Sequence, residues 1–445
     1  MGVQMDAKTS GLPRLLLLSG IGGTLEFFDF VIFLFLAPFI TKNFFPPDMP
    51  EWLATVQALG IFAAGYVFRP VGGLVMAHFG DISGRKRVFQ FSIVLMAFAT
   101  TAIALIPTYE TLGSSAALLL VLLRIVQGVA LGGEAPGAWT FIAEHVPARH
   151  LGLACSFISS SLIVGVFMAS LVTMAANWFF SPQEMLDYGW RVPFVVAGGL
   201  GLVGAFLRRW LSETPVYLRA RQERAVVNSL PLAIVLRSHW KAISISLVAT
   251  WILSAVVIVT TLMTPLILQK HYGFDAQTAL AVSAFGAPCV FVGAIAAGYL
   301  ADRIGLGSYF MAASLPFAAT TYLFYAHVTP ASGNVYFLFG IASFFKGMVG
   351  LVPCFMVRAF PGPVRFTGIS LAYNVAFAFF GALTPVVIGA LLPSASFVHL
   401  HYMMFVAAGA FLLGLYAFVR PEAVRYQAGR DEGLSNSGHE LAQRR

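Results

Sequence analysis

The sequence predicts an all-α integral membrane protein with twelve transmembrane helices in two pseudo-symmetric six-helix bundles. Three observations lead to this prediction: an apolar composition, the number and length of the apolar runs, and motifs repeated between the two halves. Hydrophobic residues make up 58% of the 445 positions, only 10% are charged, and the mean hydropathy is +0.82. A soluble domain carries about a quarter charged residues, so we expect the lipid bilayer, and no nucleic acid, as a partner.

Twelve apolar runs of about 20 residues or more are each long enough to cross roughly 30 Å of hydrocarbon as a helix. A helix satisfies its own backbone hydrogen bonds, which lipid cannot do. An even number of crossings places both ends of the chain on one side. The runs lie near residues 14–40, 53–78, 88–107, 115–143, 151–176, 190–209, 240–268, 278–301, 308–328, 335–358, 366–392 and 401–419.

The distribution of lysine and arginine between the runs predicts the orientation. If the N-terminus is cytoplasmic, the cytoplasmic segments hold 21 of these residues and the opposite segments hold three, namely Lys42, Arg191 and Lys270. Basic residues concentrate in the cytoplasmic loops of membrane proteins. We therefore predict a multi-pass protein with both termini in the cytoplasm.

Two pairs of motifs relate the halves of the chain. The stretch "GLVMAHFGDISGRKRVF" (73–89) returns in part as "GYLADRIGLG" (298–307), and "AEHVPARHLG" (143–152) returns as "RAFPGPVRFTG" (358–368). Such internal repeats are typical of secondary transporters. The predicted organisation is an N-terminal bundle over residues 1–207, a cytoplasmic linker over 208–241, a C-terminal bundle over 242–420, and a polar tail over 421–445.

The repeated cytoplasmic turns predict a latch between the bundles. An aspartate there can rest against a helix N-terminus or pair with a neighbouring arginine, and a small glycine lets two helices touch. The alternative is that the cations of residues 85–87 only anchor the topology, which leaves the second copy unexplained. The candidate gating residues are Asp81, Gly84, Arg85, Asp302 and Arg303.

Four stretches resemble the major facilitator superfamily, and within it the metabolite:proton symporters, which carry organic acids and small zwitterions. They are "GGTLEFFDFVIFLFLAP" (22–38), "FRPVGGLVMAHFGDISGRKR" (68–87), "RIVQGVALGGEAPGAWTFIAEHVP" (124–147) and "FPGPVRFTGISLAYNVAFAFFGALTP" (360–385). The resemblance implies alternating access in a bacterial inner membrane. Ala135-Pro136 replaces the aromatic-Gly pair usual in that branch, which leaves the substrate open.

Six charged residues fall inside the apolar runs. Charges buried in a membrane cost about 2.5–3.5 kcal/mol each on insertion scales and are functional candidates by default. Three are acidic and three are basic, so a fully paired set is possible, and the alternative role of the arginines is to tie helices together. The six residues are Glu26, Asp29, Arg69, Arg124, Glu134 and Lys346.

A carboxylate whose cation partner is taken by an anionic substrate gains affinity for a proton, which is a physical mechanism for symport. We therefore predict Glu26, Asp29 and Glu134 as proton-coupling residues, with Glu26 or Asp29 as the partner of Arg124. Arginine suits bidentate carboxylate recognition. The predicted substrate-binding residues are Arg69, Arg124, Lys346, Gln127, Tyr373 and Asn374.

The expected function is proton-coupled uptake of a small organic acid by a protein that works as a monomer. The partners are then an anionic small molecule and protons. Two alternatives are a symporter of a zwitterionic osmolyte such as proline or betaine, and a proton-antiporting exporter of a drug or siderophore. No HExxH, GxSxG, CxxC or GxxxxGK[ST] motif occurs, so neither an enzyme nor an ATP-driven pump is expected. We also expect no cofactor and no metal site, because the three cysteines have no ligand spacing.

Overall fold

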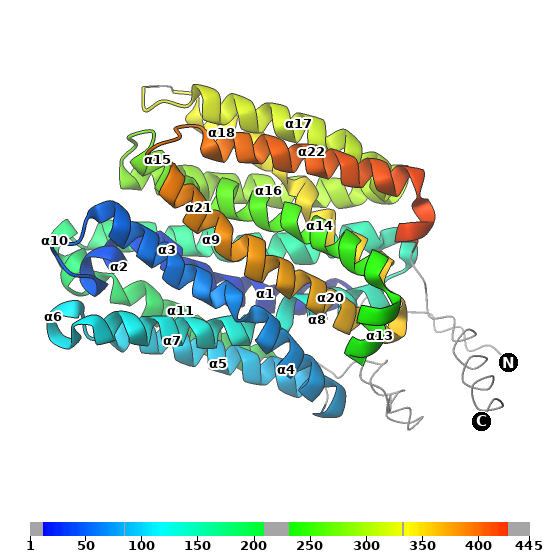
Figure 1. Ribbon diagram of the computed structural model, residues 1–445, viewed down its shortest axis with the longest axis horizontal. Coiled ribbons are helices and arrows are strands. Elements are labelled where there is room, and N and C mark those ends of the chain that lie inside the picture. The colour runs from blue at the N-terminus through cyan, green and yellow to red at the C-terminus, as the bar shows by residue number, and fades with distance from the viewer. Residues whose placement is uncertain (1–11, 84, 209–230, 332, 426–445) are drawn as a thin grey trace.

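The fold is that of a computed structural model, in which the residues described are 12–83, 85–208, 231–331 and 333–425. All regular structure in these residues is helical. In Figure 1 the helices run roughly alongside one another in two groups, the N-terminal half (blue to teal) and the C-terminal half (green to red). We call these groups the N-terminal and the C-terminal bundle.

The N-terminal bundle contains one helix or broken helix for each predicted run. Two short helices, α6 and α10, lie in its connections. The helices are α1 (Leu12–Phe35), α2 (Ala37–Phe44), α3 (Glu51–Val67), α4 (Arg69–Ser83), α5 (Arg85–Leu105), α6 (Tyr109–Leu112), α7 (Ser114–Leu131), α8 (Glu134–His145), η1 (Ala148–His150), α9 (Leu151–Phe179), α10 (Pro182–Glu184), η2 (Met185–Gly189) and α11 (Arg191–Arg208).

The C-terminal bundle differs in having π-helical turns inside two of its long helices, η3 and η5. The short helix α13 precedes it. The helices are α13 (Pro231–Ser238), α14 (Trp240–Val257), η3 (Ile258–Leu262), α15 (Thr264–Lys270), α16 (Ala276–Ile304), α17 (Leu306–His327), α18 (Val335–Lys346), η4 (Gly347–Leu351), α19 (Val352–Ala359), α20 (Gly362–Ala376), η5 (Phe377–Gly381), α21 (Ala382–Leu391), α22 (Val398–Val419) and η6 (Pro421–Val424).

Within the described residues, eight helices are long and apolar enough to cross a membrane, or up to ten if each of two bent pairs is one span. Helices α5 and α17 complete the correspondence with the twelve predicted runs. The run at 14–40 was predicted as one helix, and this is wrong: α1 and α2 meet at 58° around Leu36. Pro38 in the first turn of α2 cannot donate a backbone hydrogen bond to the preceding turn.

The two bundles contact each other along two pairs of long helices. Helix α9 packs against α16, and the α3–α4 pair packs against α20 and α21. Inside the N-terminal bundle α1 packs on α9 and α11, whereas inside the C-terminal bundle α17 packs on α22. The predicted linker, 208–241, lies largely outside the described residues, so its limits stay a prediction.

Glycines bring helices inside the N-terminal bundle into backbone contact. A β-carbon on Gly72 of α4 would lie 2.0 Å from the carbonyl oxygen of Val129 in α7. A β-carbon on Gly128 would lie 2.0 Å from the carbonyl oxygen of Gly65 in α3. No real side chain fits at such distances, so α3, α4 and α7 are packed as closely as their backbones allow.

Candidate substrate cavity and the latches beside it

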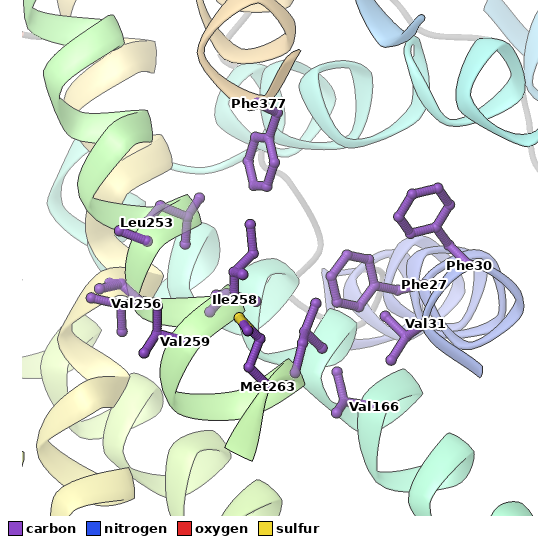
Figure 2. Packing of buried hydrophobic residues seen from close by; sticks show 14 of the residues in the cluster. Phe27, Phe30, Val31, Val166, Leu253, Val256, Ile258, Val259, Met263 and Phe377 are labelled. Atoms are coloured by element: carbon purple, nitrogen blue, oxygen red, sulfur yellow. The ribbon is translucent and has the colours of Figure 1, made fainter. Parts of the chain in front are cut away.

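A small cavity lies between the two bundles and encloses about 40 Å³. Figure 2 shows Phe27, Leu253 and Phe377, three of its lining residues, pointing toward one another from different helices. Ligand sites are typically about 300–1,000 Å³, so an organic substrate enters this one only after the helices move apart. Other lining residues are Trp139, Ser159 and Ser160 from the N-terminal bundle and Thr261, Lys346 and Tyr373 from the C-terminal bundle.

Among the described residues, Lys346 is the one cation in the lining of this cavity, and it is only 3% exposed. Its Nζ donates hydrogen bonds of 2.9 Å to the backbone oxygen of Thr260 and to Oγ1 of Thr261. Both acceptors belong to the π-helical turn η3, a type of turn found frequently at functional sites. An ammonium has three donors. No described carboxylate lies within 4 Å of Lys346, so one N–H has no hydrogen-bond acceptor among the described residues.

Arg124 does not pair with an acid of α1, and that prediction is wrong for this structure. Its Nη1 donates to the carbonyl oxygen of Phe30 at 3.1 Å and to Oε1 of Gln127 at 2.7 Å. Three phenylalanine rings surround the guanidinium at 4.2–5.1 Å. Gln127 in turn donates to Oγ1 of Thr100. Arg124 and Gln127 therefore lie in the interior of the N-terminal bundle and not in the lining of the cavity.

Arg69 lies between α4 and α20, where the bundles meet, and is 1% exposed. Its guanidinium faces the rings of Tyr373 at 4.9 Å and Phe377 at 4.6 Å, and that of Tyr66 at 5.6 Å. Nε and Nη1 have no hydrogen-bond partner among the described residues. Arg69 is thus separated from the cavity by two of the rings that line it.

The other two predicted ligand residues have different positions. Tyr373 lines the cavity and meets Trp139 edge-on, with ring centroids 4.9 Å apart. Asn374 points away from the cavity and donates from Nδ2 to the backbone oxygen of Gly132 at 2.6 Å. Gly132 lies where α7 ends and α8 begins, so this bond joins the two bundles at a helix break.

Among the described residues, the buried acids all lie in the N-terminal bundle. Both carboxylate oxygens of Asp29 lack a hydrogen-bond partner in the described part of the chain, as does Oε1 of Glu26. Asp29 points toward α11, since a β-carbon on Gly201 would lie 3.0 Å from its Oδ2. Glu134 begins α8 and accepts a hydrogen bond from Oγ of Ser92 at 3.3 Å.

Asp302 links the bundles at the end of the molecule that carries α13. Its two carboxylate oxygens accept hydrogen bonds from the backbone N–H groups of Gly152, at 2.8 Å, and Leu153, at 2.9 Å, in the first turn of α9. This is the helix N-terminus arrangement, which the helix dipole favours. Arg303 faces the ring of Tyr299 at 4.3 Å in its own helix. The side chains of Asp81 and Arg85, and all of Gly84, lie outside the described residues.

A second contact closes the opposite end of the bundle interface. Lys270, at the end of α15, forms an ion pair with Glu51, at the start of α3. The two side chains are exposed. An exposed pair contributes little stability, so we expect this contact to be weaker than the two part-buried bonds of Asp302 at the other end.

Trp139, Thr261 and the serines of α9 are cavity residues that the sequence did not indicate. Aromatic residues are 14% of this chain, so one more tryptophan in an apolar helix carries no signal. Neither do the serines, because Ser159 and Ser160 bond to backbone oxygens of their own helix. Only the packing of the bundles singles these residues out.

Comparison with solved structures supports the fold. The crystallised proton:xylose symporter XylE, bound to 6-bromo-6-deoxy-D-glucose, matches with a TM-score of 0.73 over 92% of this chain and 96% of that one. The sequences are 19% identical, so this likeness concerns the fold alone.

Relatives at higher identity are named as transporters. The ectoine/proline transporter ProP of Corynebacterium glutamicum is 31% identical over 82% of this chain and 76% of its own length. The inner membrane metabolite transport protein YhjE of Escherichia coli is 31% identical over 82% of this chain and 84% of its own. A putative proline/betaine transporter of Staphylococcus aureus is 29% identical over 86% and 82%. The family model of the Major Facilitator Superfamily matches residues 20–359, and the chain therefore belongs to this superfamily of membrane transporters.

Proposed function

We propose that the protein takes up a small carboxylate metabolite together with protons, by alternating access between its two bundles. The observation that carries this proposal is Lys346, a buried cation in the cavity between the bundles with no described carboxylate beside it. A substrate carboxylate would accept a hydrogen bond from the third N–H of Lys346. It would compete with Thr260 and Thr261 for the other two N–H groups. Lysine and arginine counts further support a cytoplasmic position for the end closed by Asp302.

Alternating access requires that each end of the interface opens in turn. The bonds of Asp302 close one end, the ion pair of Lys270 with Glu51 closes the other, and the bond of Asn374 to Gly132 joins the bundles between them. A substrate bound at Lys346 would contact both bundles, because residues of both line the cavity. Binding energy can then shift the balance between the two latches.

Glu134 is our preferred proton-coupling residue. It is buried, it begins α8, and it lies two residues from Gly132, whose carbonyl oxygen binds Asn374 of the other bundle. A change in its charge therefore acts next to a bond between the bundles. Glu26 and Asp29 are the further candidates, since an acid buried inside a membrane span is a functional candidate by default.

Substitution of Glu134 by Gln is expected to uncouple transport from protons while substrate still binds. The amide preserves the shape of the side chain, but it cannot gain or lose a proton at any pH at which the protein is folded. Substrate affinity measured against pH in nanodiscs should become flat, and uptake should no longer accumulate substrate against its gradient. Glu110 is exposed in α6, so Glu110→Gln serves as the matched control. If Glu134→Gln keeps the pH dependence of the wild type, Asp29 becomes the first candidate instead.

A zwitterionic osmolyte is the second candidate substrate. The names of the relatives favour it, and Phe27, Trp139, Tyr373 and Phe377 give the cavity an aromatic wall. Aromatic faces attract quaternary ammonium groups, while Lys346 would bind the carboxylate of the same molecule. Both candidates therefore use Lys346 and differ in what the rest of the cavity recognises.

Uptake into proteoliposomes under an imposed proton gradient tests the proposal. We expect accumulation of at least one organic acid or betaine, loss of accumulation with a protonophore, and no requirement for sodium. Liposomes without protein, and liposomes without the gradient, are the controls. Equal uptake after the gradient is dissipated, or strict dependence on sodium, would contradict proton symport.

A further inference from the structure

The indole N–H of Trp139 is a buried donor without a hydrogen-bond partner in the described part of the chain. Trp139 is fully buried, and its Nε1 makes no hydrogen bond within residues 12–83, 85–208, 231–331 and 333–425. Buried tryptophan N–H groups usually have a partner, because a lone buried donor has lost its bond to water without compensation. Such a group in a native structure requires an explanation.

The position of Trp139 explains why its indole N–H has no partner. Trp139 lines the same cavity as Lys346, and the edge-on contact with Tyr373 fixes the plane of the indole. Trp190 also has an unpartnered indole N–H, but it packs against Phe44 and Phe194 inside the N-terminal bundle and does not line the cavity. Of these two lone indoles, only that of Trp139 lies where a substrate arrives.

We propose that Trp139 donates a hydrogen bond to the substrate, and that the acceptor is an oxygen outside the carboxylate bound by Lys346. This inference rests on the proposed function and specifies its substrate class. The class consists of hydroxy acids, oxo acids and dicarboxylates short enough to reach both donors. An indole N–H can donate but cannot accept, so the partner group must be an acceptor.

The same chemistry separates the two candidate substrates. Beyond its carboxylate, betaine offers only a methylated ammonium, and proline offers only a cationic N–H₂ group. Neither of these groups can accept a hydrogen bond, so betaine or proline would have only the carboxylate to share between Lys346 and Trp139. A site built to bond a polar group discriminates strongly against a ligand that lacks it, because the donor stays unpaired.

The arrangement also links recognition to movement. Trp139 belongs to α8 of the N-terminal bundle, and Lys346 belongs to α18 of the C-terminal bundle. A ligand with two acceptor groups would bond to both bundles at once, whereas a simple monocarboxylate has a single group to share between them. Two-point ligands are therefore the ones that hold the bundles together around the cavity.

Affinities of matched ligand pairs test the proposal. Purified protein in nanodiscs is titrated with succinate, 2-hydroxybutyrate and butyrate, and with glycine betaine as the zwitterion. We expect the first two to bind about tenfold or more tightly than butyrate, the effect of one hydrogen bond. In Trp139→Phe, this preference should disappear while butyrate affinity stays within about twofold. Trp190→Phe, the same change at the other lone indole, should keep the preference.

The outcomes separate this inference from the proposed function. Binding of butyrate equal to that of succinate, or an equal loss for all ligands in Trp139→Phe, overturns the role of Trp139 and leaves carboxylate transport standing. If none of the carboxylates binds in a manner that depends on Lys346, the proposed function itself fails. Should Trp139→Phe not fold, wild-type protein labelled with ¹⁵N-tryptophan gives the answer: one indole N–H resonance should move with succinate and none with butyrate. Absence of such a shift overturns the proposal.

Discussion

Lys346→Met is expected to remove high-affinity substrate binding. Truncating one partner of a buried charge pair costs about 2–5 kcal/mol of binding free energy, and methionine matches the shape of lysine without its charge or its donors. Isothermal titration calorimetry with the best ligand from the uptake screen measures the loss. Lys346→Arg should restore part of the affinity, because the charge returns but the planar guanidinium cannot reproduce the bonds to Thr260 and Thr261.

Lys241→Met is the matched control for this substitution. Lys241 is exposed in the first turn of α14 and lies outside the lining of the cavity. Its loss should leave ligand affinity unchanged. Unchanged affinity in Lys346→Met would instead show that the substrate carboxylate binds elsewhere, and Arg69, behind the rings of Tyr373 and Phe377, would be the next cation to test.

Asp302→Asn is expected to open the end of the interface that Asp302 closes. The carboxylate accepts two backbone N–H groups of α9, and hydrogen bonds to a charged group contribute about 1.5–3 kcal/mol each. An amide keeps one acceptor oxygen and turns an NH₂ group toward the other N–H. Spin labels at Arg149 and Ile304, both exposed near this end, should report a longer distance population, and uptake should slow.

Arg303→Ala tests whether the opening expected for Asp302→Asn comes from the bonds of Asp302 to α9 or from any loss of charge in the turn between α16 and α17. Arg303 is the next residue along the chain, but it faces Tyr299 of its own helix and not the other bundle. The label distances should therefore match those of the wild type. If both variants open the interface equally, the turn acts through its overall charge and the bonds of Asp302 to α9 are not the latch.

The apolar runs and the repeated motifs were sufficient to predict an all-helical, two-bundle membrane protein. They could not predict where a helix bends. The break between α1 and α2 and the π-helical turn η3 depend on which backbone oxygen each N–H selects, and apolar composition is the same for either choice. The acceptors of Lys346 also belong to η3. The geometry of the site was therefore as unpredictable from the sequence as the bend itself.

Burial of the six charged residues was predicted, and it is confirmed, since none is more than 4% exposed. Their pairing was not predictable. Equal numbers of acids and bases suggested ion pairs, but Arg124 lies among the rings of Phe30, Phe33 and Phe62 instead. Which side chains face each other depends on the rotation of helices far apart in the sequence. The sequence therefore identified candidates without assigning their neighbours.

The glycine contacts inside the N-terminal bundle separate two properties of this transporter, thermal stability and turnover. Because Gly72 and Gly128 leave no room for a methyl group, we expect replacement of either glycine by alanine to force helices α3, α4 and α7 apart and to lower the melting temperature. The contacts that we propose to change during a transport cycle lie elsewhere, at Asp302, Asn374 and Lys270. Rate and melting temperature can therefore be altered independently, by choosing residues between the bundles or inside them.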